Sequence, residues 1–186
     1  MSEPGADRAR LFVAIDLPVD VREALVAWRA HELGGHRQLR MVEQETLHVT
    51  LCFLGGRPER EIETIGALVL ACAAPVTGLC LGAALWLPRA RPRLVAVELS
   101  DEAGALAALQ KRLAEELLAA GVYAPESRPF WPHVTVARVR RSGRLGRVDE
   151  LGPPPPLAFG GAALTLYRSR LSRAGAVYEP LAQVER

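Results

Sequence analysis

Lysine is almost absent from this sequence, and long apolar runs are absent altogether. One lysine, Lys111, stands beside 22 arginines in 186 residues. Every apolar stretch is interrupted before it reaches the roughly 20 residues of a membrane helix. The first ten residues, MSEPGADRAR, also lack the apolar core of a secretory signal. The sequence therefore predicts a cytoplasmic protein that does not enter a membrane.

Cysteine is scarce and shows no metal-binding spacing. The three cysteines are Cys52, Cys72 and Cys80, an odd number with no CxxC pair. Neither a structural zinc site nor a disulfide framework is expected from such a pattern. Each cysteine has apolar neighbours, where it serves as a small core residue.

Composition and length predict a soluble globular protein. Hydrophobic residues make up 49% and charged residues 24% of the chain, and 186 residues suffice for one domain or for two small lobes with a shared core. The net charge is only +2, but it is unevenly distributed. Residues 1–127 carry 13 basic and 17 acidic side chains, whereas residues 128–186 carry ten arginines and four acidic side chains. The basic final third indicates an anionic ligand, although genomic base composition alone could explain the arginine excess.

Strands and helices are intermixed along the chain without a strict βαβ alternation. This arrangement favours an α+β fold with antiparallel sheet. The hydrophobic patterns and turn signals predict strands at 10–16, 46–54, 78–87, 93–99, 133–139, 157–167 and 176–184, with three helices between them.

A tripeptide that occurs twice in the sequence contains the candidate catalytic residues. His48-Val49-Thr50 and His133-Val134-Thr135 lie 85 residues apart, each in a predicted strand and each followed by an aliphatic residue. Alternation along a strand puts the histidine and the threonine on one face and the valine on the other. The repeat therefore indicates two related lobes whose strands meet across a cleft.

Two imidazoles in one cleft suit paired proton transfer near neutral pH. One could take a proton from an attacking water while the other protonates the leaving oxygen, and the two threonine hydroxyls could bind a charged phosphate oxygen. A strained cyclic diester needs no metal for this reaction. A single HxT tripeptide is frequent by chance, and a lone strand histidine is more often a structural hydrogen-bonding residue. The two matched copies in similar strand contexts favour catalysis more strongly than one copy would, and the structural alternative stays open.

The sequence resembles the 2H phosphoesterase superfamily, and within it the bacterial and archaeal RNA 2′,3′-cyclic phosphodiesterases, also called 2′-5′ RNA ligases. The resemblance covers nearly the whole chain. It rests on RLFVAIDLP (10–18), TLHVTLCFLG (46–55), RPRLVAVEL (91–99), RPFWPHVTVARV (128–139) and LTLYRSRLSRAGAVYEPL (164–181).

The resemblance implies one bilobal domain over residues 1–186, with two pseudo-symmetric lobes around a central cleft. Each lobe has antiparallel sheet and helices and supplies one HxT motif. The implied activity is metal-independent hydrolysis of RNA 2′,3′-cyclic phosphate ends to 2′-phosphomonoesters, with reversible 2′-5′ ligation as the reverse reaction. The implied partners are such RNA ends or cyclic nucleotides; no cofactor and no metal are expected, and the protein is expected to be a monomer.

Specific roles follow from the motif positions. His48 is expected to be the proton donor and His133 the proton acceptor, while Thr50, Thr135 and Arg138 are expected to bind phosphate. Arg138 matches the family and is expected on the same face as His133; the alternative is a charge that faces solvent.

The aromatic residues near the motifs give further expectations. Phe130 and Trp131 could stack on a nucleobase, although burial beside the cleft is the more frequent role of such rings. Phe53 is expected to face the core. An aromatic residue is usual in the family where Met41 stands, and Cys52 replaces a frequent basic residue and is expected to point away from the histidines.

Two other functions stay open. A noncatalytic RNA-binding protein could use the same cleft as a phosphate clamp, although binding alone does not require two titratable imidazoles. A 2H enzyme for a small cyclic phosphate, such as the cyclic phosphate of ADP-ribose, would contain the same motifs. Comparing turnover of RNA ends, cyclic mononucleotides and that metabolite would separate the three.

Overall fold

An antiparallel sheet organises the computed structural model, which describes residues 8–140, 143–146, 148–171 and 176–185. Its nine strands in this part of the chain follow the order β7-β4-β5-β6-β3-β1-β8-β9, with β2 also paired to β6. The strands are β1 (Arg8–Asp16), β2 (Leu39–Met41), β3 (His48–Pro58), β4 (Leu79–Leu87), β5 (Leu94–Asp101), β6 (His133–Val139), β7 (Ala158–Phe159), β8 (Ala163–Leu171) and β9 (Ala176–Glu185).

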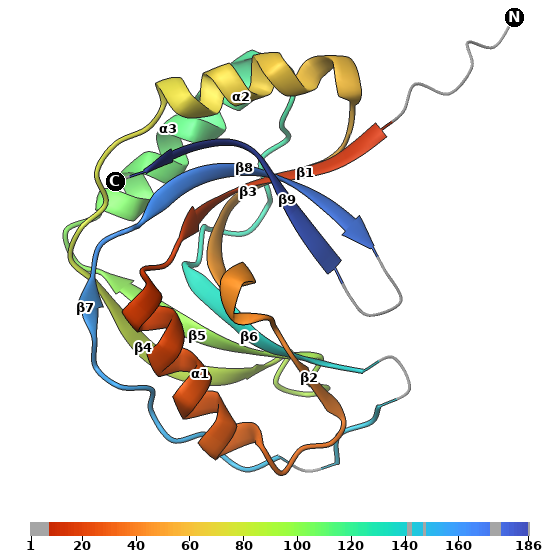
Figure 1. Ribbon diagram of the computed structural model, residues 1–186, viewed down its shortest axis with the longest axis vertical. Helices are drawn as coiled ribbons and strands as arrows, with labels where there is room; N and C mark the ends of the chain where they lie inside the picture. Colours follow the sequence, from red (N-terminus) through yellow and green to blue (C-terminus); the bar gives the residue numbers. More distant parts are fainter. Residues whose placement is uncertain (1–7, 141–142, 147, 172–175, 186) are drawn as a thin grey trace, which may run out of the picture.

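Helices cover the outer side of the curled sheet (Figure 1). The helices α2 (Ile62–Ala71) and α3 (Ala105–Ala119) lie along the half that contains β1, β3, β8 and β9, and α1 (Val19–Leu33) lies along the half that contains β4, β5 and β6. Two short 3₁₀ turns, η1 (Gln44–Thr46) and η2 (Glu59–Glu61), flank β3. Among the described residues, no helix has both the length and the apolar character needed to cross a membrane.

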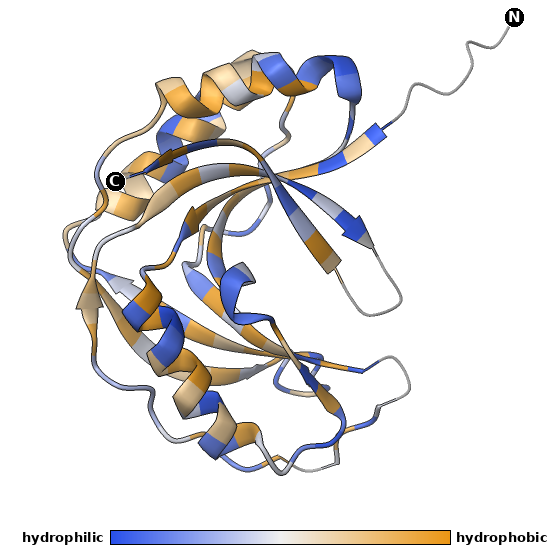
Figure 2. Cartoon of the chain, in the orientation of Figure 1, coloured by the Kyte–Doolittle hydropathy of each residue, from blue (hydrophilic) through white to orange (hydrophobic). Residues whose placement is uncertain are grey.

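Buried apolar side chains hold the sheet and its helices together. Hydrophilic and hydrophobic residues alternate around α1 (Figure 2). In β1 the five consecutive residues 11–15 are apolar and at most 3% exposed, so both faces of this stretch of the strand are covered. The α3 stripe of Leu106, Leu109, Leu113 and Leu117 is likewise buried, and each such leucine contributes about 2 kcal/mol of hydrophobic stabilisation.

The two halves of the sheet join through a narrow connection. Strands β3 and β6 share one residue pair, Val49 opposite Val134, whereas β1 and β3 pair along nine residues. The expected α+β fold with antiparallel sheet and a pseudo-symmetric arrangement is confirmed. The sheet is continuous across the two halves, so each HxT motif lies at the junction.

Matched β-bulges follow the two motifs. In β3, Val13 pairs with Cys52 and Ala14 with Thr50, which leaves Leu51 as an extra residue. In β6, Val95 pairs with Ala137 and Ala96 with Thr135, which leaves Val136 as an extra residue. Each bulge lies three residues after its histidine, and an extra residue reverses the alternation of the residues that follow. Consequently, the fifth residue after each histidine returns to the histidine face.

Candidate active site

The central pairing of β3 with β6 brings the two HxT motifs side by side. Val49 and Val134 are opposite each other and completely buried. The flanking histidines and threonines are half-buried on the other face. In an antiparallel ladder of this register, His48 lies across from Thr135 and Thr50 across from His133. The sequence alone predicted one motif from each lobe, and the structure brings all four side chains together.

Backbone contacts fix the His48 imidazole. Its Nδ1 lies 2.6 Å from the carbonyl oxygen of Thr46, and its Nε2 lies 3.1 Å from Thr50 Oγ1. The carbonyl can only accept, so Nδ1 carries the donated proton and the neutral ring has its acceptor at Nε2. The rings of Phe12 and Tyr178 pack against this imidazole with centroid distances of 5.0 and 5.4 Å.

His133 is held in the same way. Its Nδ1 lies 2.9 Å from the carbonyl oxygen of Trp131, two residues earlier, as Thr46 is two residues before His48. The indole of Trp131 stacks on the imidazole with centroids 4.4 Å apart. Both histidines therefore present Nε2 to the shared face, which is the nitrogen that a substrate would meet.

A carboxylate lies across the ladder from each histidine. Asp16 of β1 is opposite His48, and Glu98 of β5 is opposite His133. Glu98 accepts a hydrogen bond from the indole nitrogen of Trp131 at 3.0 Å. The sequence reasoning missed both carboxylates, because strand partners cannot be assigned before the topology is known.

The Asp16 carboxylate is held by three neutral donors from β8 and β9. The hydroxyls of Thr165 and Tyr167 donate to it at 2.7 and 2.8 Å, and the Gln183 amide donates at 3.1 Å. Burial, followed by the charge and hydrogen bond of Asp16, raises the pKa of Tyr167, so its hydroxyl remains a donor at neutral pH. A hollow of about 400 Å³ opens beside this network.

The free protein favours neutral His48. Burial lowers the pKa of the imidazole below its usual 6.5, and the positive charge of Arg138 and the electrostatic interaction with His133 act in the same direction. The hydrogen bond to the Thr46 carbonyl and the charge of Asp16 oppose this effect. A bound phosphate anion would also oppose it, because an adjacent negative charge stabilises the imidazolium.

The bulges bring Arg138 and Phe53 to the histidine face. On an unbroken strand a residue five positions after a histidine faces the opposite side, but the extra Val136 returns Arg138, which is exposed. The expectation that Phe53 faces the core is wrong. Its ring is 39% exposed, lies 6.5 Å from that of Phe12, and carries the Arg10 guanidinium 4.7 Å above it.

Most of the other aromatic and sulfur-containing residues singled out from the sequence lie in or against the hydrophobic core. Phe130 and Met41 pack partly buried against the core. Cys52 is 1% exposed and points away from the histidines, as expected. On an unbroken strand a residue four positions after His48 would share its face, and the extra Leu51 reverses this orientation. Burial raises the pKa of its thiol to about 12, which excludes it as a thiolate nucleophile at neutral pH. Trp131 already stacks on His133, and base stacking by Phe130 and Trp131 stays a prediction.

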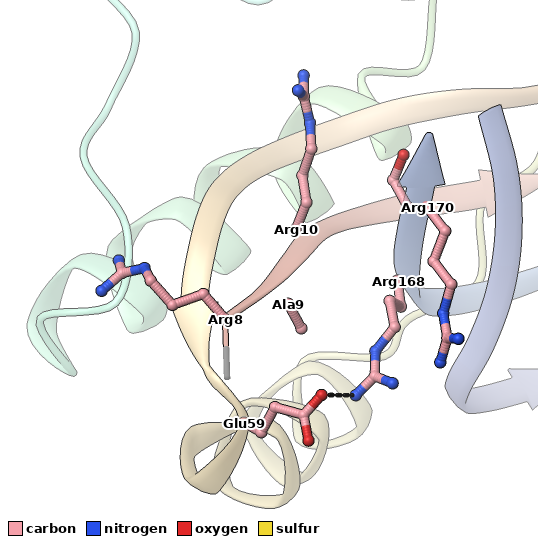
Figure 3. A pocket seen from close by; sticks show the side chains of 7 residues that line it. Arg8, Ala9, Arg10, Glu59, Arg168 and Arg170 are labelled. Carbon is pink, nitrogen blue, oxygen red and sulfur yellow. Dashed lines mark hydrogen bonds and ion pairs between the residues drawn. The ribbon is translucent and has the colours of Figure 1, made fainter. Parts of the chain in front are cut away.

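A second hollow, of about 370 Å³, is rich in arginine and, like the first, is lined by no HxT residue. It is lined by Arg8, Ala9, Arg10, Glu59, Arg168, Ser169 and Arg170 (Figure 3). Arg168 donates to Glu59 at 2.9 Å, the dashed contact in Figure 3, and also pairs with Glu179 at 3.8 Å. The two glutamates therefore already neutralise part of the positive charge of this hollow. Within the described ranges, no group of three or more His, Cys, Asp and Glu residues could hold a metal ion.

A curled antiparallel sheet with two imidazole–hydroxyl motifs on adjoining strands defines a two-histidine acid–base site, as in the 2H phosphoesterases. The chain belongs to the 2′-5′ RNA ligase superfamily, whose family model matches residues 17–173. This confirms the family resemblance.

Characterised relatives and solved structures agree with this assignment. The chain is 31% identical over 185 residues to the RNA 2′,3′-cyclic phosphodiesterase of Escherichia coli, covering 97% of this chain and 96% of the relative. The enzyme of the same name from Thermus thermophilus is also 31% identical, with 92% and 87% covered. The structure superposes on E. coli LigT in its apo form with a TM-score of 0.80 and 28% identity, covering 96% of this chain and 98% of LigT.

Proposed function

We propose that this protein hydrolyses 2′,3′-cyclic phosphate ends of RNA to 2′-phosphomonoesters. The observation that carries the proposal is the Val49–Val134 pair, which sets two imidazoles and two hydroxyls on one face. The names of the relatives support the reaction class. E. coli LigT, 28% identical over 96% of this chain with a TM-score of 0.76, has also been solved with 3′-AMP bound.

The reaction divides the proton transfers between the two Nε2 atoms. His133 Nε2 takes a proton from a water molecule, whose oxygen forms a new bond to phosphorus. The bond from phosphorus to the 3′-oxygen breaks, and His48 Nε2 gives its proton to that oxygen. The products are a 3′-hydroxyl and a 2′-phosphate, and the sites return to their starting states by exchanging one proton with solvent.

Phosphate binding falls to the hydroxyls and to one arginine. Thr50 and Thr135 donate to the nonbridging oxygens, and the Arg138 guanidinium stabilises the charge that grows on them during attack. His48 acts as the acid once the bound phosphate has raised the pKa that burial lowers in the free protein. The negative charge of the neighbouring Asp16 also raises the pKa of His48.

The whole chain acts as one bilobal unit, in which each half of the sheet supplies one HxT motif. Trp131, which stacks on His133, and its sequence neighbour Phe130 stack on a base of the bound RNA end. The site also supports the reverse reaction, because a 5′-hydroxyl can replace water as the nucleophile on the cyclic phosphate. The family name favours this 2′-5′ ligation as a second activity. The protein needs no metal, no cofactor and no second copy for these steps.

Product analysis tests the proposal. Purified protein is incubated with cytidine 2′,3′-cyclic phosphate, and chromatography separates the 2′- and 3′-monophosphates. We expect the 2′-phosphate alone, at a rate that EDTA leaves unchanged. Formation of the 3′-phosphate, or no turnover with retained RNA affinity, would refute the proposal. Parallel assays with ADP-ribose cyclic phosphate and with RNA halves carrying a cyclic phosphate and a 5′-hydroxyl test the other two reactions.

A further inference from the structure

Two arginines lie directly opposite each other at the end of the candidate site. Arg40 of β2 pairs with Arg138 of β6. The same edge of β6 first meets β3, at Val134, and then β2, from Ala137 to Val139. The edge that carries His133 and Thr135 therefore continues into a cross-strand pair of arginines.

Both arginines are on the same face as the two histidines. Leu39 and Met41, on either side of Arg40, pack into or against the core, and so do Ala137 and Val139 beside Arg138. Alternation along each strand turns the two arginines away from that core. The charge of Arg138 also reaches the buried imidazole of His48.

Hydrogen bonds from the buried Arg29 join the two strands that carry these arginines. Arg29 of α1 is 6% exposed, and its Nη1 donates both to the carbonyl of Val42 and, at 3.1 Å, to that of Val136. Val42 N also donates to Val136 O at 3.0 Å. These bonds join the end of β2 to the bulge of β6. An anion bound between two arginines that are opposite each other on paired strands would interact favourably with both charges.

We propose that Arg40 and Arg138 bind the phosphodiester one nucleotide upstream of the cyclic phosphate. This inference rests on the proposed function and narrows its substrate to an oligoribonucleotide end. Arg138 follows Thr135 by three residues, or on the order of 7–10 Å at about 3.3 Å per residue, a span that one extended nucleotide can bridge. Arg138 thus lies between the two phosphates, and Arg40 holds the outer one.

The test compares two substrates in one assay. Wild-type protein and R40Q are given cytidine 2′,3′-cyclic phosphate and a trinucleotide that ends in the same group. We expect wild-type kcat/KM to be higher for the trinucleotide, and R40Q to reduce that preference roughly tenfold. The slope of log KM for the trinucleotide against log salt concentration should also fall by about one in R40Q, because one phosphate contact is lost. The matched control is R60Q, which removes an exposed arginine of η2 and should leave the preference unchanged.

The possible outcomes distinguish a failure of the proposed subsite from a failure of the proposed function. Equal wild-type kcat/KM for both substrates, or an undiminished preference in R40Q, overturns the subsite while the proposed function stands. No turnover of either substrate by the wild type overturns the proposed function. Thermal melting accompanies each assay. It shows whether R40Q remains folded, and R40K, which keeps the positive charge, should retain most of the preference.

Discussion

Asp16 lies directly across the β1–β3 ladder from His48, yet its carboxylate accepts hydrogen bonds from Thr165, Tyr167 and Gln183. The imidazole instead donates to the Thr46 carbonyl. Asp16 therefore acts on His48 through its charge, and three neutral donors keep that charge in position.

Replacing Asp16 with Asn should lower the pKa of His48 further. The loss of a nearby negative charge destabilises the imidazolium, by up to about one pKa unit. Since His48 is the proposed acid, the alkaline limb of the kcat pH profile should move to lower pH. An Asp20→Asn variant, altered on α1, is the control. An unmoved alkaline limb in D16N would contradict this role for Asp16.

His48 should make the folded protein less stable at mildly acidic pH. Its folded pKa is below the unfolded value of about 6.5, so the unfolded chain binds the proton more readily. The stability contribution is fully present above pH 6.5 and is lost as the pH falls towards the lower folded value. Urea unfolding of wild type and H48Q at pH 7.5 and 5 should show a smaller loss in H48Q. H31Q, which alters a side chain that is 86% exposed, should match the wild type.

Replacing Arg29 with Met should weaken the junction of β2 with β6. The change removes two charge-assisted hydrogen bonds to buried carbonyls, at a cost of about 2–4 kcal/mol in the free energy of unfolding. Denaturant titration measures this, with Lys111→Met as the control at an exposed i,i+4 pair. A loss of unfolding free energy no larger than that of the control would show that the Arg29 hydrogen bonds do not stabilise this junction.

Phe53 should contribute to nucleotide affinity. Phe53 is partly exposed on the histidine side, where a base can take the place of the Arg10 guanidinium above its ring, and stacking on a base contributes about 1–3 kcal/mol. Phe53→Ala should therefore raise KM for a cyclic nucleotide about tenfold or more, with little change in melting temperature. Leu118→Ala, at a side chain of similar exposure on α3, should change neither. An unchanged KM in F53A would place the base elsewhere.

The sequence predicted the main elements of the fold because they depend on local patterns. Alternation identified β1 and β6, and leucine spacing identified α3. The HVT repeat gave the four central side chains of the site. By contrast, the orientation of Phe53 was mispredicted because alternation assumes an unbroken strand, and a bulge is not visible in HVTLCF. Asp16, Glu98 and Arg40 could not be identified as site neighbours because each depends on pairing with a strand distant in the sequence.

The central claim is that two imidazoles on paired strands share one reaction. It is tested most directly by the kcat of H48N, H133N and the double variant on a 2′,3′-cyclic phosphate, with circular dichroism to confirm the fold. We expect each single variant to lose about 10²–10⁴-fold and the double variant to lose little more, because residues that act as one unit are not additive. A single variant within about tenfold of wild-type kcat, a loss far below that range, would contradict the account.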